Sequence, residues 1–88
     1  MVDVVVDEKA LKILRFLKEH GATTYEIVRN VGMGWEPAMA RIRNFIVYGI
    51  VNVRDLPREG AKLYTLTEKG LKVLRLAEEL RHLIRSSG

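Results

Sequence analysis

The sequence predicts a mainly α fold with one small antiparallel β-hairpin, in the order helix, helix, helix, strand, strand, helix. Three observations support this: apolar residues recur at helical spacing up to residue 49, alternate between residues 50 and 66, and return to helical spacing from residue 68. A chain of 88 residues forms one domain, which we expect to span residues 1–85. Such a domain buries only about 60–65% of the surface of its unfolded chain, which leaves little room for a deep substrate cavity.

The first predicted helix runs from Glu8 to His20. Asp7 precedes it as an N-cap, and Gly21 follows it as a left-handed stop. Its apolar residues recur at three- and four-residue spacing, which predicts one buried face. The β-branched run at residues 2–6 is compatible with either a short edge strand or an amino-terminal arm.

The next two helices are joined by a tight turn that contains glycine. Thr23 and Glu26 form a capping-box pattern at the start of a short helix that ends at Gly32. Pro37 lies in the first turn of the following helix, where its missing N–H has no cost, and Gly49 ends that helix. Two helices connected in this way form a helix-turn-helix.

The two strands of the hairpin are predicted at residues 50–54 and 61–66, where apolar and polar residues alternate. The residues between them include Pro57 and Gly60, and they are too many for a two-residue turn. We therefore expect an extended tip from residue 55 to residue 60.

The final helix begins after Thr67, which is its predicted cap, and runs from residue 68 to about residue 85. Residues 86–88 are expected to be a disordered tail. The apolar stripe of this helix is wider than one short helix needs, which favours a homodimer. The predicted dimer contacts are Val73, Leu76, Leu80, Leu83 and Ile84.

The net charge of +4 lies in the carboxyl-terminal two thirds of the chain. Residues 1–34 contain five basic and five acidic side chains, whereas residues 35–88 contain ten basic and six acidic ones. This asymmetry favours a polyanionic partner that contacts residues 35–88, although scattered surface charge on a small basic protein gives a similar count.

Composition excludes several classes of function. The chain has no cysteine and only two isolated histidines, so we expect no disulfide framework, no metal site and no cofactor. It has no arrangement typical of a catalytic triad and no phosphate-binding loop, so we expect that the protein is not an enzyme. Its apolar runs are far shorter than the roughly 20 residues of a membrane span, and we expect a cytoplasmic protein without membrane contact.

Two motifs resemble those of the MarR-like and PadR-like transcription regulators, which are winged helix-turn-helix proteins. The first is Val-Gly-Met-Gly at residues 31–34, followed by Arg41, Ile42 and Phe45 and by Tyr-Gly-Ile-Val at residues 48–51. The second is Tyr-Thr-Leu-Thr-Glu-Lys-Gly at residues 64–70, which is similar to the family pattern Tyr-x-Leu-Thr-x-x-Gly. The resemblance covers residues 8–85.

The resemblance implies a double-stranded DNA-binding protein and a transcription regulator. Its third helix would enter the major groove, and its basic hairpin, called the wing, would contact the flanking backbone or minor groove. The candidate DNA contacts lie at the start of the second helix, on the third helix and on the wing: Thr23, Thr24, Tyr25, Trp35, Met39, Arg41, Arg43, Asn44, Arg54, Arg58 and Lys62.

Two alternatives remain open. Trp35, Met39, Ile46 and Val47 would form an apolar docking surface if the chain were a protein-interaction module of a transcription, replication or repair assembly. Trp35 and Tyr25 would be stacking platforms if it bound RNA or a single strand.

Overall fold

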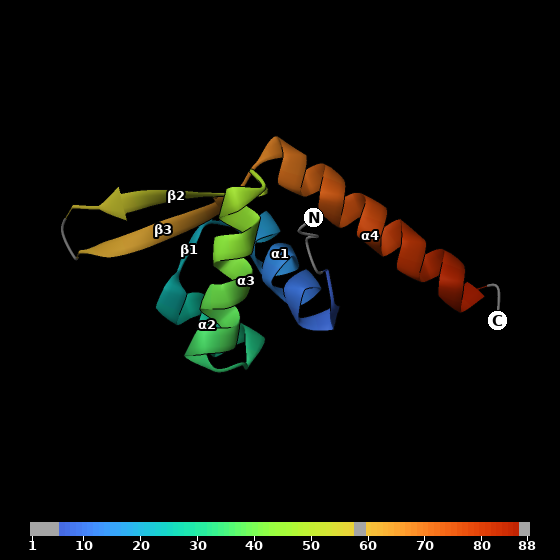
Figure 1. Ribbon diagram of the computed structural model, residues 1–88, viewed down its shortest axis with the longest axis horizontal. Coiled ribbons are helices and arrows are strands. Elements are labelled where there is room, and N and C mark those ends of the chain that lie inside the picture. The colour runs from blue at the N-terminus through green and yellow to red at the C-terminus, as the bar shows by residue number, and fades with distance from the viewer. Residues whose placement is uncertain (1–5, 58–59, 87–88) are drawn as a thin grey trace.

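The computed structural model of the protein describes residues 6–57 and 60–86. Its elements are α1 (Glu8–Glu19), β1 (Ala22–Thr23), α2 (Thr24–Val31), α3 (Trp35–Val47), β2 (Val51–Leu56), β3 (Ala61–Leu66) and α4 (Glu68–Ser86). The helices α1, α2 and α3 form the centre, and the wing (β2 and β3) and α4 project from it in opposite directions (Figure 1). The molecule is therefore elongated, with principal extents of 49 × 27 × 24 Å. The predicted mainly α fold with one hairpin is confirmed.

Local capping sets most helix ends where the sequence predicts them. Asp7 Oδ1 accepts a 2.8 Å hydrogen bond from the N–H of Ala10 at the start of α1, and Thr67 Oγ1 accepts one of 2.9 Å from Gly70 at the start of α4. Gly32 and Gly49, which follow α2 and α3, both have φ of +74°, a conformation that favours glycine. These stops are confirmed.

A third strand, β1, was not predicted. It consists of two residues and pairs with β3, with Ala22 opposite Tyr64 and Thr23 opposite Leu63, so that the sheet order is β1-β3-β2. The prediction that Gly21 is a left-handed stop is wrong, because α1 ends in extended backbone at His20, and the described glycines with positive φ are at other positions. A Cβ at Gly21 would lie only 3.0 Å from Cγ2 of Thr65, so this glycine permits the close approach of the chain to β3.

The tip of the wing is shorter than expected. Asp55 pairs with Lys62 and Leu56 pairs with Ala61, so the strands continue two residues beyond the predicted end of the first strand. The prediction of a tip that begins at residue 55 is therefore wrong. Arg58 lies outside the described residues, as do residues 2–5 of the run that was predicted to be an edge strand or an arm.

The core lies between the three central helices and the inner face of the sheet. Its largest fully buried side chains come from all four helices and from residues 50–51, and are Phe45, Leu11, Ile13, Leu14, Ile27, Ile42, Ile50, Leu74 and Val51. This packing fixes the orientation of α3 about its own axis, because Ala38, Ile42 and Phe45 are all fully buried.

Only part of α4 packs against this core. Gly70 and Leu74 are its buried residues, and two ion pairs join it to α1: Arg15 Nε lies 2.6 Å from Glu78 Oε2, and Arg81 pairs with Glu8. The helix extends to Ser86, whose hydroxyl bonds the carbonyl of Leu83. The predicted tail is therefore wrong at Ser86, and residues 87–88 lie outside the described part of the chain.

Candidate nucleic-acid interface

Four exposed side chains of α3 follow one line along the helix, which we call the outward row: Glu36, Ala40, Arg43 and Val47. They follow one another at four- and three-residue spacing, which places them on one side of a helix. The opposite side is the buried face described above, so the core itself turns the outward row toward solvent. Among the predicted contacts, Arg43 lies in this row, whereas Trp35 and Met39 do not.

Trp35 and Met39 instead line a cleft of about 520 Å³ between α3, the start of α2 and the wing. Its lining contains six of the predicted contact residues, namely Thr23, Thr24, Tyr25, Trp35, Met39 and Lys62. It also contains Gly60, Ala61 and Tyr64, which the sequence did not nominate. These residues reach the cleft because β3 pairs with β1, the strand that leads into α2, and no local pattern signals that pairing.

The start of α2 is held by its capping box. The backbone N–H of Thr23 donates to Glu26 Oε1 at 2.9 Å, and Thr23 Oγ1 accepts from the N–H of Glu26 at 3.3 Å. The same hydroxyl also donates to Glu26 Oε1 at 3.3 Å. The predicted phosphate contact of the Thr23 hydroxyl therefore competes with its hydrogen bonds in the capping box. The capping box also fixes the backbone that carries Thr24 and Tyr25, and Tyr25 is 67% exposed.

Arg41 is held against the amino-terminal end of α1. Its Nη2 lies 2.6 Å from Asp7 Oδ2, its Nε lies 3.2 Å from Asp7 Oδ1, and its Nη1 donates to the carbonyl of Pro37 at 3.1 Å. This two-point contact lowers the pKa of the Asp7 carboxyl, and the N–H of Ala10 lowers it further. The same contact raises the pKa of Arg41. A guanidinium bonded in this way holds α3 against the start of α1, and these bonds compete with the predicted DNA contact of Arg41. Asn44 is half-buried on α3.

Two of the basic wing residues predicted to contact DNA, Arg54 and Lys62, lie in the described part of the chain. Arg54 is exposed on β2. Lys62 Nζ lies 2.7 Å from Asp55 Oδ1 on the neighbouring strand, and this carboxylate raises the pKa of Lys62. The pair is exposed, so it is weak and can open for a phosphate.

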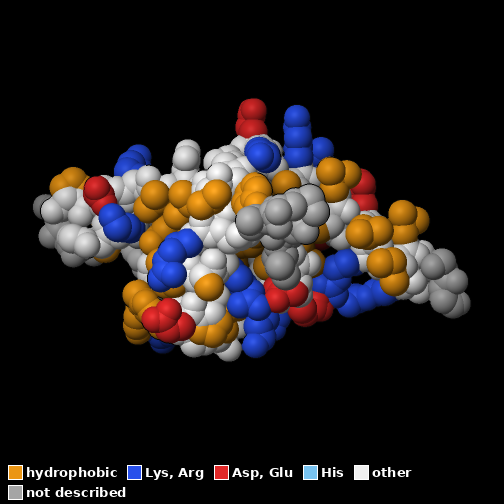
Figure 2. Space-filling model, viewed as in Figure 1, with side chains coloured by type: hydrophobic (Ala, Val, Ile, Leu, Met, Phe, Trp, Pro, Cys, Tyr) orange, Lys and Arg blue, Asp and Glu red, His pale blue; other side chains and the backbone are white. Residues whose placement is uncertain are grey.

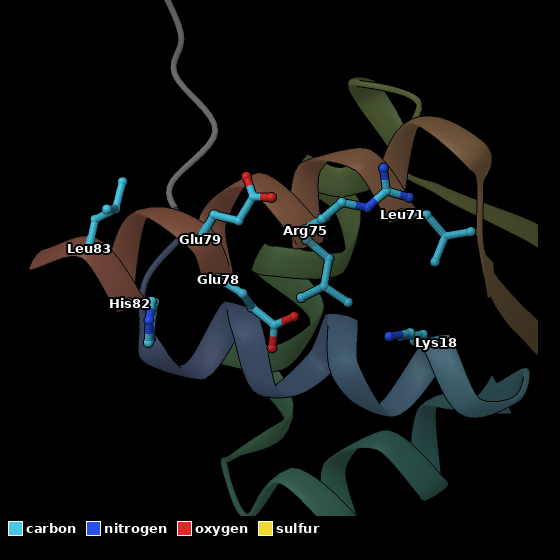
Figure 3. Close-up of a pocket in the computed structure, with 8 residues that line it drawn as sticks. Lys18, Leu71, Arg75, Glu78, Glu79, His82 and Leu83 are labelled. Carbon is cyan, nitrogen blue, oxygen red and sulfur yellow. The ribbon is translucent and has the colours of Figure 1, made fainter. Parts of the chain in front are cut away.

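A second hollow of about 600 Å³ lies between α1 and α4, away from α3. Figure 3 shows Glu78 of α4 directed toward α1 and Lys18 on α1 facing α4. Leu71, Arg75, Glu79, His82 and Leu83 complete the labelled lining. The hollow arises where α4 leaves the core, and the sequence did not predict it.

Apart from Leu83, which also lines this hollow, the predicted dimer residues lie on another side of α4. Leu76, Leu80, Leu83 and Ile84 are each 58–63% exposed, whereas Val73 packs partly against the core. Figure 2 shows apolar side chains gathered along the outer half of this helix. Four large apolar side chains on one exposed helix form an apolar surface that the described chain leaves uncovered.

Neither a metal centre nor a membrane span is present in the described part of the chain. Residues 6–57 and 60–86 contain no group of three histidine, cysteine, aspartate or glutamate side chains that could hold a metal ion. No helix within these ranges has the length and apolar character needed to cross a membrane.

A family model described as "Winged helix-turn-helix" matches residues 8–85. No curated protein sequence matches the chain. Among solved structures, a PadR family transcription regulator from Clostridium difficile superposes with a TM-score of 0.84 at 16% identity, over 92% of this chain and 94% of that one.

Two longer structures show the same architecture. The zinc-responsive MarR family member ZitR from Lactococcus lactis gives a TM-score of 0.76 at 16% identity, over 98% of this chain and 60% of that one. BpsR from Bordetella bronchiseptica, whose DNA binding is regulated by 6-hydroxynicotinic acid, gives a TM-score of 0.79 at 15% identity, over 97% of this chain and 62% of that one. This chain therefore spans about three fifths of the length of these two regulators, and at such identities the likeness shows the fold alone.

Proposed function

The chain belongs to the winged helix-turn-helix family, and from this premise we propose that it is a double-stranded DNA-binding transcription regulator. The outward row of α3 enters the major groove, and the wing contacts the flanking backbone or minor groove. The observation that carries the proposal is the outward row itself: four exposed side chains on one side of a helix whose other side is fixed in the core. An α-helix fits the major groove, which is about 12 Å wide.

The chemistry of the outward row is suited to reading base edges. Arg43 can donate two hydrogen bonds to O6 and N7 of guanine, and Glu36 can accept one from N4 of cytosine. Ala40 and Val47 are small apolar groups that fit the methyl group of thymine. The contacts that position the protein come from Thr24, Arg54 and Lys62, which reach phosphates and carry no sequence information.

We further propose that the protein is a homodimer through α4. Val73, Leu76, Leu80 and Leu83 are spaced three, four and three residues apart, which is the seam of a two-helix coiled coil, and Ile84 lies beside it. A two-fold symmetric pair of reading helices requires a pseudo-palindromic site with half-sites about one turn, 34–36 Å, apart. The proposed role is binding in the cytoplasm, with no catalytic step and no cofactor.

The test is retention of the protein on random-sequence duplex DNA at about 50 mM salt, followed by selection and sequencing of the bound duplexes. We expect retention and a preferred site that contains guanine. Arg43→Ala should lose the guanine preference at one position, at a cost of about 1–3 kcal/mol, whereas Lys12→Ala, a basic residue on the outer face of α1, should leave the preference unchanged.

Failure to retain any duplex at this salt concentration would contradict the proposal. Capture of a protein partner that survives nuclease treatment, together with that failure, would favour the protein-interaction alternative.

A further inference from the structure

The cleft beside α3 contains two aromatic side chains, Tyr25 and Trp35, that have no role in the proposed reading of a continuous duplex. Its lining comes from three parts of the fold, namely the start of α2, the first half of α3, and the wing from its tip into β3. The residues are Thr23, Thr24, Tyr25, Trp35, Met39, Gly60, Ala61, Lys62 and Tyr64. Its volume of about 520 Å³ falls in the range of about 300–1,000 Å³ that is typical of small-molecule sites. Trp35 and Met39 are the sequence neighbours of Glu36 and Ala40 in the outward row, so DNA bound as proposed above would pass close to the cleft.

Two aromatic rings in this cleft are exposed. Trp35 is 55% exposed and Tyr25 is 67% exposed, whereas Tyr64 is 3% exposed and forms part of the buried core. The ring-to-ring contact in the described part of the chain joins Phe16 and His20 on α1. Trp35 and Tyr25 therefore have no ring partner within residues 6–57 and 60–86, and their faces are available to a planar ligand.

The charge of the cleft suits an anion. Lys62 is the only charged residue in its described lining. The nearby carboxylate of Glu26 is already bonded to Thr23, and that of Asp55 is bonded to Lys62 in an exposed pair. A ligand with a planar aromatic group and a negative charge fits this combination.

We propose, on the basis of the DNA-binding function proposed above, that the cleft binds one unpaired nucleotide of the DNA. Its base stacks on Trp35 and Tyr25, and its phosphate is held by Lys62. Within a continuous duplex the faces of the bases are hidden in the stack, whereas an unpaired base can leave the stack and offer a face to an aromatic side chain. The protein therefore prefers a duplex that ends in a short single strand over the same duplex with blunt ends.

The chain contains one tryptophan, so its intrinsic fluorescence reports on the cleft directly. The experiment titrates the protein with a blunt duplex, with the same duplex carrying a short thymidine overhang, and with the overhang strand alone. We expect the overhang to quench the fluorescence of Trp35 and to bind at least about fivefold more tightly than the blunt duplex, given the usual strength of base stacking on aromatic residues.

The measured quantity for the variants is the ratio of the two duplex affinities. Trp35→Ala and Tyr25→Ala should each reduce this ratio toward one, and Trp35→Phe, which keeps an aromatic face, should retain most of it. Leu71→Ala removes an exposed apolar side chain of α4 outside the cleft and should leave the ratio unchanged. Circular dichroism of each variant checks the fold.

Equal affinity for the blunt and overhang duplexes, or a preference that survives the double replacement of Trp35 and Tyr25, would overturn this inference and leave the DNA-binding proposal standing. Quenching by the blunt duplex to the same extent would show that the cleft holds paired DNA, which also overturns it. Retention of none of the duplexes would overturn the DNA-binding function itself.

Discussion

Gly70 is the position in the described chain where an added Cβ would be most crowded. That Cβ would clash with the backbone carbonyl oxygen of Ile50 and would lie 2.6 Å from Cδ1 of Leu66. The carbonyl of Ile50 also accepts hydrogen bonds from the N–H and the hydroxyl of Thr67, so it cannot easily move away. The glycine of the Tyr-x-Leu-Thr-x-x-Gly motif is thus required by the contact between α4 and the segment that joins α3 to β2.

We expect Gly70→Ala to destabilise the protein by about 1–3 kcal/mol or more, because a methyl group must displace backbone. Urea unfolding followed by circular dichroism measures this loss. The control is Gly34→Ser: Gly34 has ordinary φ of −66° and no side-chain cap, so a serine hydroxyl should cap α3 and raise stability by about 0.5–1 kcal/mol. A Gly70→Ala variant as stable as the wild type would contradict the clash.

The charge of Asp7 makes the stability of the folded protein depend on pH. Because Arg41 lowers its pKa in the folded state, the ionised carboxylate contributes stability above its unfolded-state pKa, and that contribution is lost as the pH falls through the folded-state pKa. Asp7→Asn keeps an oxygen that can cap α1 but removes the charge. We expect the variant to be less stable at neutral pH by up to about 1 kcal/mol, since the pair is half-exposed.

The difference between wild type and Asp7→Asn should shrink on acidification below about pH 4. Melting temperatures measured from neutral pH to about pH 2 check this. A difference that stays constant across the whole range would show that the charge of Asp7 has no role.

At the scale of elements, α4 is the helix in which the burial predicted from the sequence and the burial in the structure differ most. Its stripe predicts burial along most of its length, but Leu74 is its buried large side chain, and the outer half projects from the core with Leu76, Leu80, Leu83 and Ile84 exposed. The ion pairs to α1 at Glu78 and Arg81 are exposed and add little. A second copy of the chain would cover this surface.

We expect Leu80→Glu to convert a dimer to a monomer, because it places a charge in the middle of the apolar seam. Sedimentation equilibrium measures the mass of each species. The side chain is 58% exposed in the single chain, so the variant should still fold. His82→Glu places the same charge on the side of α4 that lines the hollow against α1 and should leave the dimer intact. A wild-type protein that is monomeric at all concentrations would contradict the proposed dimer.

The short strand β1 shows a limit of sequence analysis at this scale. Two residues carry no detectable alternation, and their strand character comes entirely from pairing with β3, about 40 positions later in the chain. The same pairing explains Gly21 through a contact with Thr65 instead of through its own backbone angles. Both features depend on residues that are distant in the sequence.

For the whole molecule, DNA binding depends on where the basic side chains lie more than on the net charge. The excess of four positive charges lies in residues 35–88, but the structure divides the basic residues of that segment into groups with different roles. Arg41 ties α3 to α1 and Arg81 ties α4 to α1. Arg43 and Arg54 are exposed on α3 and the wing. Net charge therefore overstates the number of side chains that can contact DNA.

We expect binding to a random duplex to weaken steeply with salt, and Arg54→Ala to reduce the slope of log affinity against log salt by about one, equally for all sequences. Lys12→Ala is the matched control and should leave the slope unchanged. Fluorescence anisotropy of a labelled duplex across a salt series measures both. If the two variants have the same slope, the wing does not contact phosphate.

The sequence by itself determined most helix boundaries, the presence of the hairpin and the candidate segments, because caps, glycine stops and hydrophobic periods act over a few residues. It assigned the predicted contact residues to helices and strands that the structure also has, but it did not separate the residues of the outward row from those of the cleft. Only the tertiary structure separated the outward row from the cleft, committed Arg41 to Asp7 and left the outer half of α4 uncovered. These features depend on how α3 is rotated against the core and on which distant segments meet, and both are decided by packing between elements that no local pattern encodes.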